Sequence, residues 1–366
     1  MIAPARADTG QDYPLAAHFP RLGERVPRVS LSNGPSPVSR LERLSASLGR
    51  DDIWLKNDGL FGTIYGGNKP RKLQFVLADA LRKRAKRVLT TGTIGTNHGL
   101  ATAIYAREFG LETSLLLAYE EPSPDNVATL LQIASTGARI HYTRSYPLTA
   151  AVAPYFIARY RLRDRRMPYL LGPGGSSVLA SLGYADAAFE LAGQVRAGQL
   201  PEPAWIVIPL GTGGTVAGLL AGLRLAGLDT RIVAVTATRA PTTWRLAVKR
   251  LARAVAKRIA HESGEHNIAQ VRLDGLRIEA GWIGPGFGRE SAAGLEAQTL
   301  VEDLEGLHVD PAYTAKSMAA LIGLSRTGSL PGPVLFWHTY NALALPEPDP
   351  AAAALIPGSL RRVCKL

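Results

Sequence analysis

Short apolar segments alternate along the chain with longer segments whose apolar residues recur at helical spacing. The short segments have the character of buried strands and lie at residues 53–57, 87–91, 113–118, 138–143, 204–210 and 231–237. Several are followed by a helical pattern, at residues 70–84, 100–110, 125–137 and 216–227. This alternation predicts parallel sheets that are covered by helices on both faces. Because 366 residues exceed what one hydrophobic core usually supports, two such domains are expected.

The composition is that of a globular protein with a basic excess. Hydrophobic residues make up 46% of the chain and charged residues 20%, which is ordinary for a folded protein. The net charge of +12 would suit nucleic acid or another anionic partner. The densest basic segments, 81–87 and 245–258, have helical spacing with alanine and leucine between the charges. We interpret them as solvated helix faces, with nucleic-acid binding as the alternative.

Cysteine, histidine and signal patterns argue against several classes of protein. Cys364 is the only cysteine in the sequence, so neither a disulfide framework nor a zinc–cysteine cluster is expected. His261 and His266 lie five residues apart, unlike the pair of an HExxH motif, and no metal is expected. Residues 1–14 lack the apolar run of a secretory signal, and no segment approaches the roughly 20 apolar residues of a membrane span. We therefore expect a cytoplasmic protein without membrane contact.

The first chemical motif is GGNKPRKL, residues 66–73, which leads into a predicted helix. Asn68 is a suitable N-cap and Pro70 suits the first turn, so Lys69 is expected at the helix N-terminus. Lys69, Arg71 and Lys72 would place three cations where the helix dipole is already positive, with no visible compensation. A desolvated lysine in a positive site favours its neutral amine, which can attack an aldehyde. A basic, solvent-exposed turn is the alternative.

The second motif is GTGGT, residues 211–215, between a predicted strand and a predicted helix. Glycines allow successive backbone N–H groups to point at one anion, and the helix N-terminus adds its positive end. The motif lacks the Lys-Ser/Thr pair of a Walker loop, and Val216 occupies the third glycine position of the dinucleotide fingerprint. It therefore predicts a phosphate-binding turn, with a tight turn that binds no ligand as the alternative.

The third motif is TGTIGTNHGLATA, residues 91–103, which begins at the end of a predicted strand. Thr96, Asn97 and His98 form a polar group at a helix start, and Gly95 and Gly99 allow close approach. As a bare pattern this group is only an N-cap. At the carboxyl end of a parallel strand, however, it lies where open α/β sheets bind ligands.

With these motifs in this order, the sequence resembles the fold type II pyridoxal-phosphate enzymes, specifically the D-cysteine desulfhydrase and aminocyclopropanecarboxylate deaminase family. Further matching segments lie at residues 35–62, 172–184 (GPGGSSVLASLGY), 284–288 (GPGFG), 310–318 (DPAYTAKSM) and 334–339 (VLFWHT). The resemblance implies an α/β fold of the tryptophan synthase β type, with two three-layer αβα domains, parallel-rich sheets and the cofactor, pyridoxal 5'-phosphate, in the cleft. The small domain would span residues 57–170, and the large domain residues 1–56 plus 171–366. A homodimer is also implied.

The resemblance assigns cofactor-binding residues. Lys69 would form the Schiff base with the cofactor and later move the α-proton of the substrate. Asn97 would contact the ring oxygen beside the imine. The phosphate would be held by Gly211, Thr212, Gly213, Gly214 and Thr215. Thr314 and Thr339 would be partners of the pyridine nitrogen, and a neutral threonine there makes the ring a milder electron sink than a carboxylate would.

The resemblance also assigns residues around the substrate. Thr96 and Tyr313 would be catalytic residues that contact the substrate. The remaining neighbours of the substrate would be His98, Phe287 and Tyr340. His98 is expected to be structural or to contact the substrate rather than to act as a general base, because Lys69 already fills that role.

These features predict a pyridoxal-phosphate-dependent lyase that acts on a small amino acid by α-proton abstraction and β-elimination. Gly95, Phe287, Tyr340 and Asn341 depart from the residues of the family. The lost phenol at position 287 argues against opening of a cyclopropane ring, and Tyr340 and Asn341 are expected to reshape the cavity. Deamination, β-replacement or racemisation of an unusual amino acid is therefore the alternative. Non-catalytic binding of an anionic partner, suggested by the net charge, is a second alternative.

Overall fold

The structure, a computed structural model, describes residues 7–8, 13–237 and 241–366. Most of residues 1–14, which were expected to lack a secretory signal, lie outside these ranges. The strands are β1 (Ala7–Asp8), β2 (Arg28–Val29), β3 (Val38–Arg40), β4 (Ile53–Asn57), β5 (Arg87–Thr93), β6 (Glu112–Ala118), β7 (Arg139–Arg144), β8 (Tyr169–Leu171), β9 (Trp205–Leu210), β10 (Arg231–Thr236), β11 (Leu276–Glu279) and β12 (Val334–His338).

The α-helices are α1 (Pro14–His18), α2 (Pro20–Arg25), α3 (Glu42–Ser47), α4 (Asn68–Arg82), α5 (Asn97–Glu108), α6 (Pro124–Ser135), α7 (Tyr146–Asp164), α8 (Val178–Arg196), α9 (Gly214–Leu225), α10 (Pro241–Ser263), α11 (Ala292–Glu305), α12 (Thr314–Arg326) and α13 (Gly358–Cys364). Short 3-10 helices are η1 (Asp58–Leu60), η2 (Pro173–Gly175), η3 (His266–Gln270) and η4 (Pro350–Leu355). Among the described residues, no helix is both long enough and apolar enough to cross a membrane.

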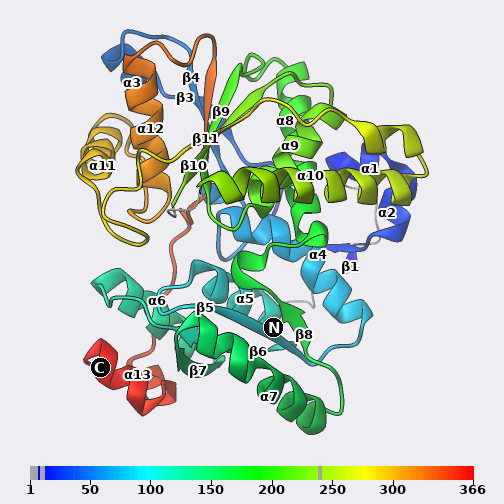
Figure 1. Cartoon of the computed structure of the whole chain (residues 1–366), viewed down its shortest axis with the longest axis vertical. Helices are drawn as coiled ribbons and strands as arrows, with labels where there is room; N and C mark the ends of the chain where they lie inside the picture. Colours follow the sequence, from blue (N-terminus) through cyan, green and yellow to red (C-terminus); the bar gives the residue numbers. More distant parts are fainter. Residues whose placement is uncertain (1–6, 9–12, 238–240) are drawn as a thin grey trace.

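Two sheets, one above the other in Figure 1, organise the chain. The larger sheet has the strand order β11-β10-β9-β12-β4-β3, and its pairs are parallel except for β3 with β4. The smaller sheet has the order β7-β6-β5-β8 and is entirely parallel. The α/β fold with two parallel-rich sheets that the sequence predicted is therefore confirmed.

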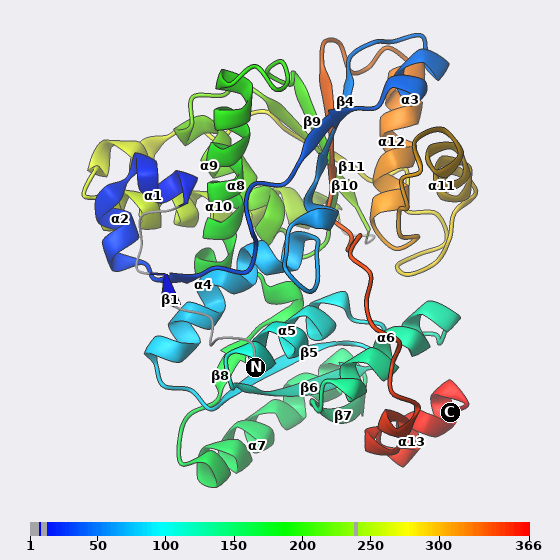
Figure 2. The same cartoon turned by 180° about the vertical axis from the view of Figure 1, so that it is seen from behind.

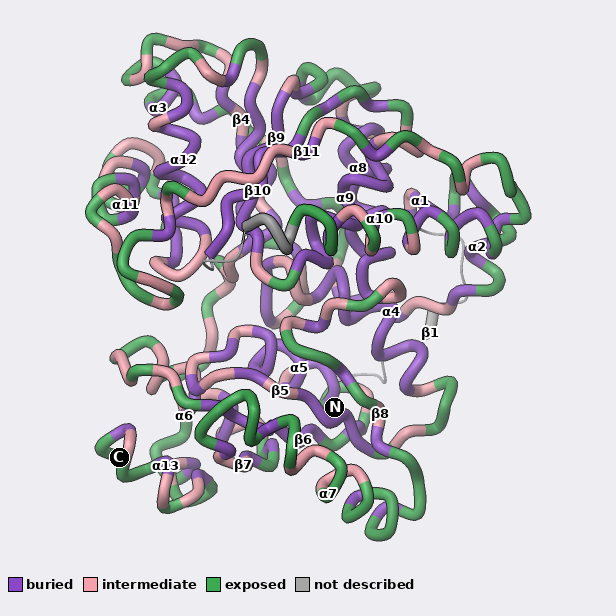
Figure 3. The backbone as a smooth tube through the Cα atoms, in the orientation of Figure 1, coloured by how far each residue is buried: buried purple, intermediate pink, exposed green. Residues whose placement is uncertain are grey.

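Helices cover both faces of the larger sheet, as Figures 1 and 2 show. On one face, Ile206 and Ile208 of β9 pack in a core with helices α8, α9 and α10. On the other face, Val207 of the same strand packs in a core with helices α3, α11 and α12. Alternate residues of the strand thus enter opposite cores, which is why the strands read as continuous apolar runs. Figure 3 shows the buried residues gathered along the strands and the inner sides of the helices.

The smaller sheet is covered by α7 on one face and by α4, α5 and α6 on the other. Leu89 and Leu116 pack with α7, whereas Val88 and Leu115 enter the opposite core. Leu360 of α13 also belongs to that opposite core, and Figures 1 and 2 show the C-terminus beside the smaller sheet. The C-terminal segment therefore packs on the small domain, although the expected boundaries place residues 171–366 in the large one.

The two basic segments lie differently in the structure. In α10, Arg250 and Arg253 are exposed while Val248 and Ala252 are buried, as the interpretation of a solvated helix face requires. The segment 81–87 departs from that interpretation at its end. Arg87 belongs to β5, is 1% exposed and pairs with Asp164 at 2.8 Å, so part of the basic excess is neutralised inside the fold.

Candidate active site

A cavity of about 210 Å³ lies between the two sheets. It opens where strands β5, β9 and β12 end, because residues at or just after the carboxyl end of each strand line it. Carboxyl ends of parallel strands are where open α/β folds bind ligands. The sequence-predicted residues that line the cavity are Lys69, Thr96, Asn97, His98, Gly211, Thr212, Gly213, Thr215, Phe287, Tyr313, Thr339 and Tyr340.

The turn that carries Lys69 is fixed by close backbone contacts. Gly67, not Asn68, is the N-cap of α4, and its φ of 91° lies in the region that favours glycine. A Cβ atom at Gly67 would lie 2.6 Å from the carbonyl oxygen of Thr339, and the Asn68 N–H donates to that oxygen at 3.1 Å. The prediction of Asn68 as N-cap is therefore wrong. Its side chain instead reaches Thr215, whose hydroxyl accepts from Asn68 Nδ2 at 3.4 Å.

The Lys69 amine is desolvated in the cavity rather than exposed on a basic turn. Burial lowers the pKa of Lys69 to about 8, against the opposing attraction of Asp310. Burial, followed by repulsion from Lys69, likewise holds the pKa of Lys72 well below its usual value. A substantial fraction of the Lys69 amine is therefore neutral near pH 8, which nucleophilic attack on a carbonyl requires.

The N-terminus of α5 forms a second wall of the cavity. Thr96 is the N-cap, and its hydroxyl accepts from the Gly99 N–H at 3.1 Å. Asn97 Oδ1 accepts from the Tyr65 hydroxyl at 3.3 Å. His98 Nε2 lies 2.9 Å from the Thr90 hydroxyl. Burial first, then the nearby lysines, holds the pKa of His98 well below its usual value, so this histidine lines the site as a neutral group.

The glycine turn after β9 forms the third wall. Gly213 has a φ of 86° and is the N-cap of α9, so the first N–H groups of this helix have no partner within it. The Thr212 hydroxyl lies 2.5 Å from the Ser176 hydroxyl. Lys72 approaches the same region, because its Nζ donates to the carbonyl oxygen of Gly174 at 3.4 Å. Backbone N–H groups, hydroxyls and the Lys72 amine together make a donor set that suits a phosphate group.

Two of the predicted cofactor-binding residues do not line the cavity. Gly214 faces Ser176, whose Oγ would lie 2.6 Å from a Cβ atom added there. Thr314 is fully buried and donates its hydroxyl to Asp310 Oδ1 at 2.5 Å. Of the two threonines expected beside a pyridine nitrogen, only Thr339 lines the cavity.

Asp310 is a cavity residue that the sequence analysis missed. Its carboxylate accepts the backbone N–H groups of Tyr313 at 2.9 Å and Thr314 at 3.0 Å, and so caps α12. Its charge also contributes, after burial, to the raised pKa of Tyr313. The sequence analysis predicted no helix at residues 314–326 and the aspartate lies four residues before it, so no local signal pointed to Asp310.

A further group of polar side chains that line the cavity was also missed. They come from the end of β6, the first turns of α6 and α7, and the turn before α4. The residues are Tyr65, Glu120, Ser123, Asp125, Asn126, Thr129 and Tyr146. Within the described residues, no group of three or more His, Cys, Asp or Glu side chains could hold a metal ion.

Comparison with known proteins identifies the group of enzymes to which this arrangement is similar. A family model described as "Pyridoxal-phosphate dependent enzyme" matches residues 29–339. D-cysteine desulfhydrase of Salmonella schwarzengrund (strain CVM19633) is 35% identical over 331 residues, which are 88% of this chain and 96% of that protein. A second D-cysteine desulfhydrase, from Salmonella newport (strain SL254), matches with the same identity and coverage.

Solved structures agree with these sequence matches. The crystal structure of an ACC deaminase homologue has a TM-score of 0.76 and 28% identity, covering 94% of this chain and 99% of that one. Maize serine racemase, at 15% identity and a TM-score of 0.57, covers 85% of this chain and 90% of its own, and shares the fold. The family match over residues 29–339 and the relatives at 35% identity lead to one conclusion: the chain belongs to the pyridoxal-phosphate dependent enzyme family.

Proposed function

We propose that the protein is a lyase that removes the α-proton of a small amino acid and eliminates its β-substituent, as a D-cysteine desulfhydrase does. The observation that carries this proposal is the Lys69 amine, which lines the cavity with a pKa lowered by burial to about 8. The glycine turn and the start of α5 lie around the same cavity. Relatives named D-cysteine desulfhydrase align with nearly the whole chain.

The residues present fit pyridoxal phosphate. Gly211, Thr212, Gly213 and Thr215 would hold the phosphate, with the Lys72 amine as a further donor. Thr339 would lie beside the pyridine nitrogen, and Asn97 beside the ring oxygen. Lys69 would bond covalently to the cofactor. When bound, the cofactor supplies an electron sink for the charge left by the departing α-proton.

The chain's own groups account for the remaining steps. The Lys69 Nζ, which lines the cavity with a lowered pKa, would act as the base that takes the α-proton of the substrate. The N–H groups at the start of α5 favour a carboxylate, since they have no partner within the helix. Thr96 would contact the substrate there. The ring of Phe287 lies edge-on to that of Tyr313, with centroids 5.5 Å apart, and these two would form an apolar wall that excludes water.

A different reaction on a less common amino acid is the second candidate, and one contact favours it. A Cβ atom at Gly95 would lie 2.0 Å from Asn126 Oδ1, so the Asn126 amide occupies the space above position 95. The wall beside the substrate therefore differs from that expected of the family. The leaving group, and with it the choice between elimination and replacement, depends on this wall.

The test of the proposal is spectroscopic. Protein purified with pyridoxal phosphate is expected to show the visible absorbance band of a lysine-bound cofactor, and Lys69→Ala is expected to lose it. Lys83→Ala is a matched control at the end of the same helix, because the Lys83 side chain is 60% exposed and pairs with Asp79. A normal band in Lys69→Ala would remove the assignment.

Product analysis then distinguishes the two candidate reactions. We expect pyruvate and sulfide from D-cysteine, measured beside L-cysteine, D-serine and 1-aminocyclopropane-1-carboxylate. An intact absorbance band without product from any of these would support the second candidate.

We also propose that the enzyme is a homodimer in the cytoplasm. The family resemblance supports the dimer, and the single cysteine supports a reducing compartment. Sedimentation equilibrium would test the oligomeric state.

A further inference from the structure

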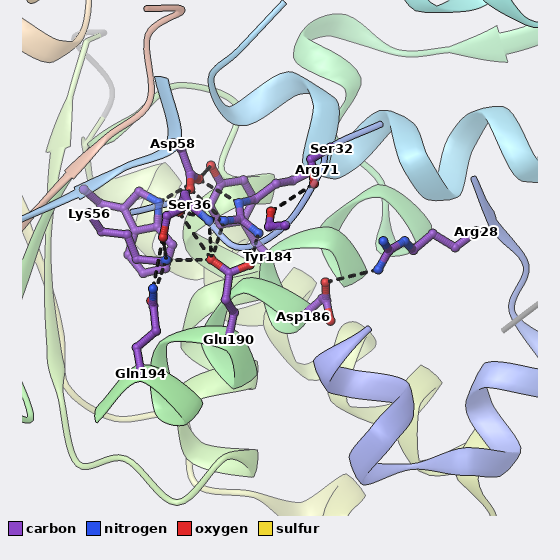
Figure 4. Close-up of polar contacts among 12 residues, drawn as sticks. Arg28, Ser32, Ser36, Lys56, Asp58, Arg71, Tyr184, Asp186, Glu190 and Gln194 are labelled. Carbon is purple, nitrogen blue, oxygen red and sulfur yellow. Dashed lines mark hydrogen bonds and ion pairs between the residues drawn. The ribbon is translucent and has the colours of Figure 1, made fainter. Parts of the chain in front are cut away.

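A group of buried charged and polar side chains is connected to the first turn of α4 through Arg71, and Figure 4 shows the contacts between them. None of its members lines the cavity, and the proposed reaction uses none of them. All are at most 7% exposed. The members are Ser36, Lys56, Asp58, Arg71, Tyr184, Glu190, Gln194 and Trp337.

Asp58 is the centre of this group. Its carboxylate accepts two hydrogen bonds from the Arg71 guanidinium, at 2.9 Å from Nε and 2.8 Å from Nη2. It also accepts from Ser36 Oγ at 2.8 Å, from the Tyr184 hydroxyl at 2.7 Å and from Trp337 Nε1 at 2.7 Å. A carboxylate with this many charged and neutral donors is held in one orientation.

The charges within the group balance. Glu190 accepts from Lys56 Nζ at 2.6 Å and from Arg71 Nη2 at 2.8 Å, so two carboxylates face two cations. Burial acts to raise the pKa of Glu190, but Arg71 and Lys56 outweigh it and lower the pKa to about 2. The positive charge of Arg71 at the start of α4 is therefore compensated by the carboxylates of Asp58 and Glu190, which the local sequence did not show.

Asp58 holds the chain on both sides of Lys69. Its backbone carbonyl oxygen accepts the Gly67 N–H at 2.7 Å, two residues before the lysine. Its carboxylate holds Arg71, two residues after the lysine. Asp58 itself follows directly after β4 of the larger sheet. The first turn of α4 is thus attached at both ends to one residue of a rigid element.

We propose that Asp58 is a positioning residue for Lys69, and that it keeps the Arg71 guanidinium out of the cavity that Lys69 and Lys72 line. By holding Arg71 away from the cavity, it leaves the Lys69 amine at the reacting position. This inference rests on the proposed function, in which Lys69 bonds to pyridoxal phosphate. An unpaired Arg71 would compete for the same bound anion, and the lysine would lose its alignment.

Asp58→Asn tests the proposal, because it keeps the size and the backbone carbonyl but removes the charge that Arg71 pairs with. A misplacement of about 1 Å costs about a hundredfold in a reaction that depends on alignment. We therefore expect the absorbance band to form roughly ten to a hundred times more slowly when pyridoxal phosphate is added to the apo-protein. The circular dichroism of that band, which reports a fixed cofactor orientation, is expected to fall.

Asp186→Asn is the matched control. Asp186 also has a buried carboxylate, at 3% exposed, and lies on the same helix as Glu190. It binds the Leu15 N–H at 2.9 Å and has no contact with Arg71 among the described hydrogen bonds and ion pairs. We expect this variant to lower the melting temperature while leaving the rate of band formation within a factor of about two.

A double variant separates positioning from stability. Asp58→Asn with Arg71→Met leaves Lys56 paired with Glu190, so the buried charges balance again. Stability is expected to recover in part, but band formation is expected to stay slow because the attachment after Lys69 is still missing. Recovery of the wild-type rate would overturn the proposal.

A milder variant keeps the proposal testable if Asp58→Asn does not fold. Tyr184→Phe removes one donor to Asp58 without changing any charge, and band formation is expected to slow by a few-fold. The role of Asp58 would be refuted if both Asp58→Asn and Tyr184→Phe formed the band at the wild-type rate and with wild-type circular dichroism. If Asp58→Asn does not fold, the same result in Tyr184→Phe alone would refute it. If the wild-type protein itself formed no band, the proposed function would fail, and this inference with it.

Discussion

Replacing Gly183 by alanine is expected to force α8 away from α4 at the turn that carries Lys69. A Cβ atom at Gly183 would lie 2.0 Å from the carbonyl oxygen of Arg71, 1.4 Å less than the 3.4 Å of an ordinary contact. It would also lie 2.5 Å from the carbonyl carbon of Arg71. The opposing atoms are backbone, so no side-chain rotation can relieve the overlap, and the two helices must separate.

The expected cost follows from two opposing effects. Overpacking of a core costs about 1–3 kcal/mol, and a backbone overlap of this size belongs at the upper end. The higher helix propensity of alanine offsets about 1 kcal/mol of this cost. We therefore expect Gly183→Ala to lower the free energy of unfolding by about 2 kcal/mol.

Gly193 provides a control on the same helix. A Cβ atom there would meet nothing within 4 Å, so Gly193→Ala is expected to raise the free energy of unfolding by up to about 1 kcal/mol. Urea unfolding of the two apo-proteins should separate them by about 3 kcal/mol. Equal midpoints and slopes would show that α4 and α8 do not approach closely at Arg71, and the reasoning about the Lys69 turn would be refuted.

Two further predictions concern the cavity. Because burial lowers the pKa of Lys69 to about 8, band formation with pyridoxal phosphate should accelerate as pH rises toward 8 and level off above it; a rate that still climbs at pH 10 would indicate an ordinary lysine. Gly95→Ala should raise KM for the amino acid about tenfold, since its Cβ would lie 2.0 Å from Asn126 Oδ1. Adding Asn126→Ala to Gly95→Ala should bring KM back toward the wild-type value. Purely additive effects of the two substitutions on KM would contradict the contact.

The sequence predicted six of the longer strands. Residues 53–57 coincide with β4, residues 204–210 begin one residue before β9, and residues 87–91 end two residues before β5 does. Strands β1, β2, β3, β8, β11 and β12 lay outside the predicted set. All of these except β12 are two to four residues long, too short for a two-residue alternation to stand out. β12 has five residues, as many as β4, and was missed all the same.

Local sequence patterns could not predict the order of strands in the larger sheet. β12 lies between β9 and β4, pairing Leu335 with Ile206 and with Leu55. These partners are separated by more than a hundred residues of sequence, and nothing in a short window records such a pairing. The C-terminal segment illustrates the same difficulty, because Leu360 enters a core built mainly from residues before position 180.

Local rules failed most clearly at the Lys69 turn. Three cations at a helix start looked uncompensated because Asp58 and Glu190 lie 13 and 119 residues from Arg71 in the sequence. The expected N-cap was displaced by one residue because Gly67 accommodates the Thr339 carbonyl oxygen, which Asn68 could not. The break in local preference nevertheless marked the region that we propose as the active site.

The residues that depart from the family divide into two kinds once their contacts are known. Asn341 is occupied by the backbone: its Oδ1 accepts the Gly66 N–H at 2.6 Å, and its Nδ2 donates to the Leu343 carbonyl oxygen at 2.8 Å. It therefore stabilises the loop before Lys69, and its amide is largely engaged by the backbone. Tyr340 lines the cavity, as Asn341 does, and burial followed by the charge of Asp310 raises the pKa of Tyr340 to about 12. A neutral phenol at this wall can donate a hydrogen bond to a substrate, so we expect the choice of amino acid to depend on Tyr340 rather than on Asn341.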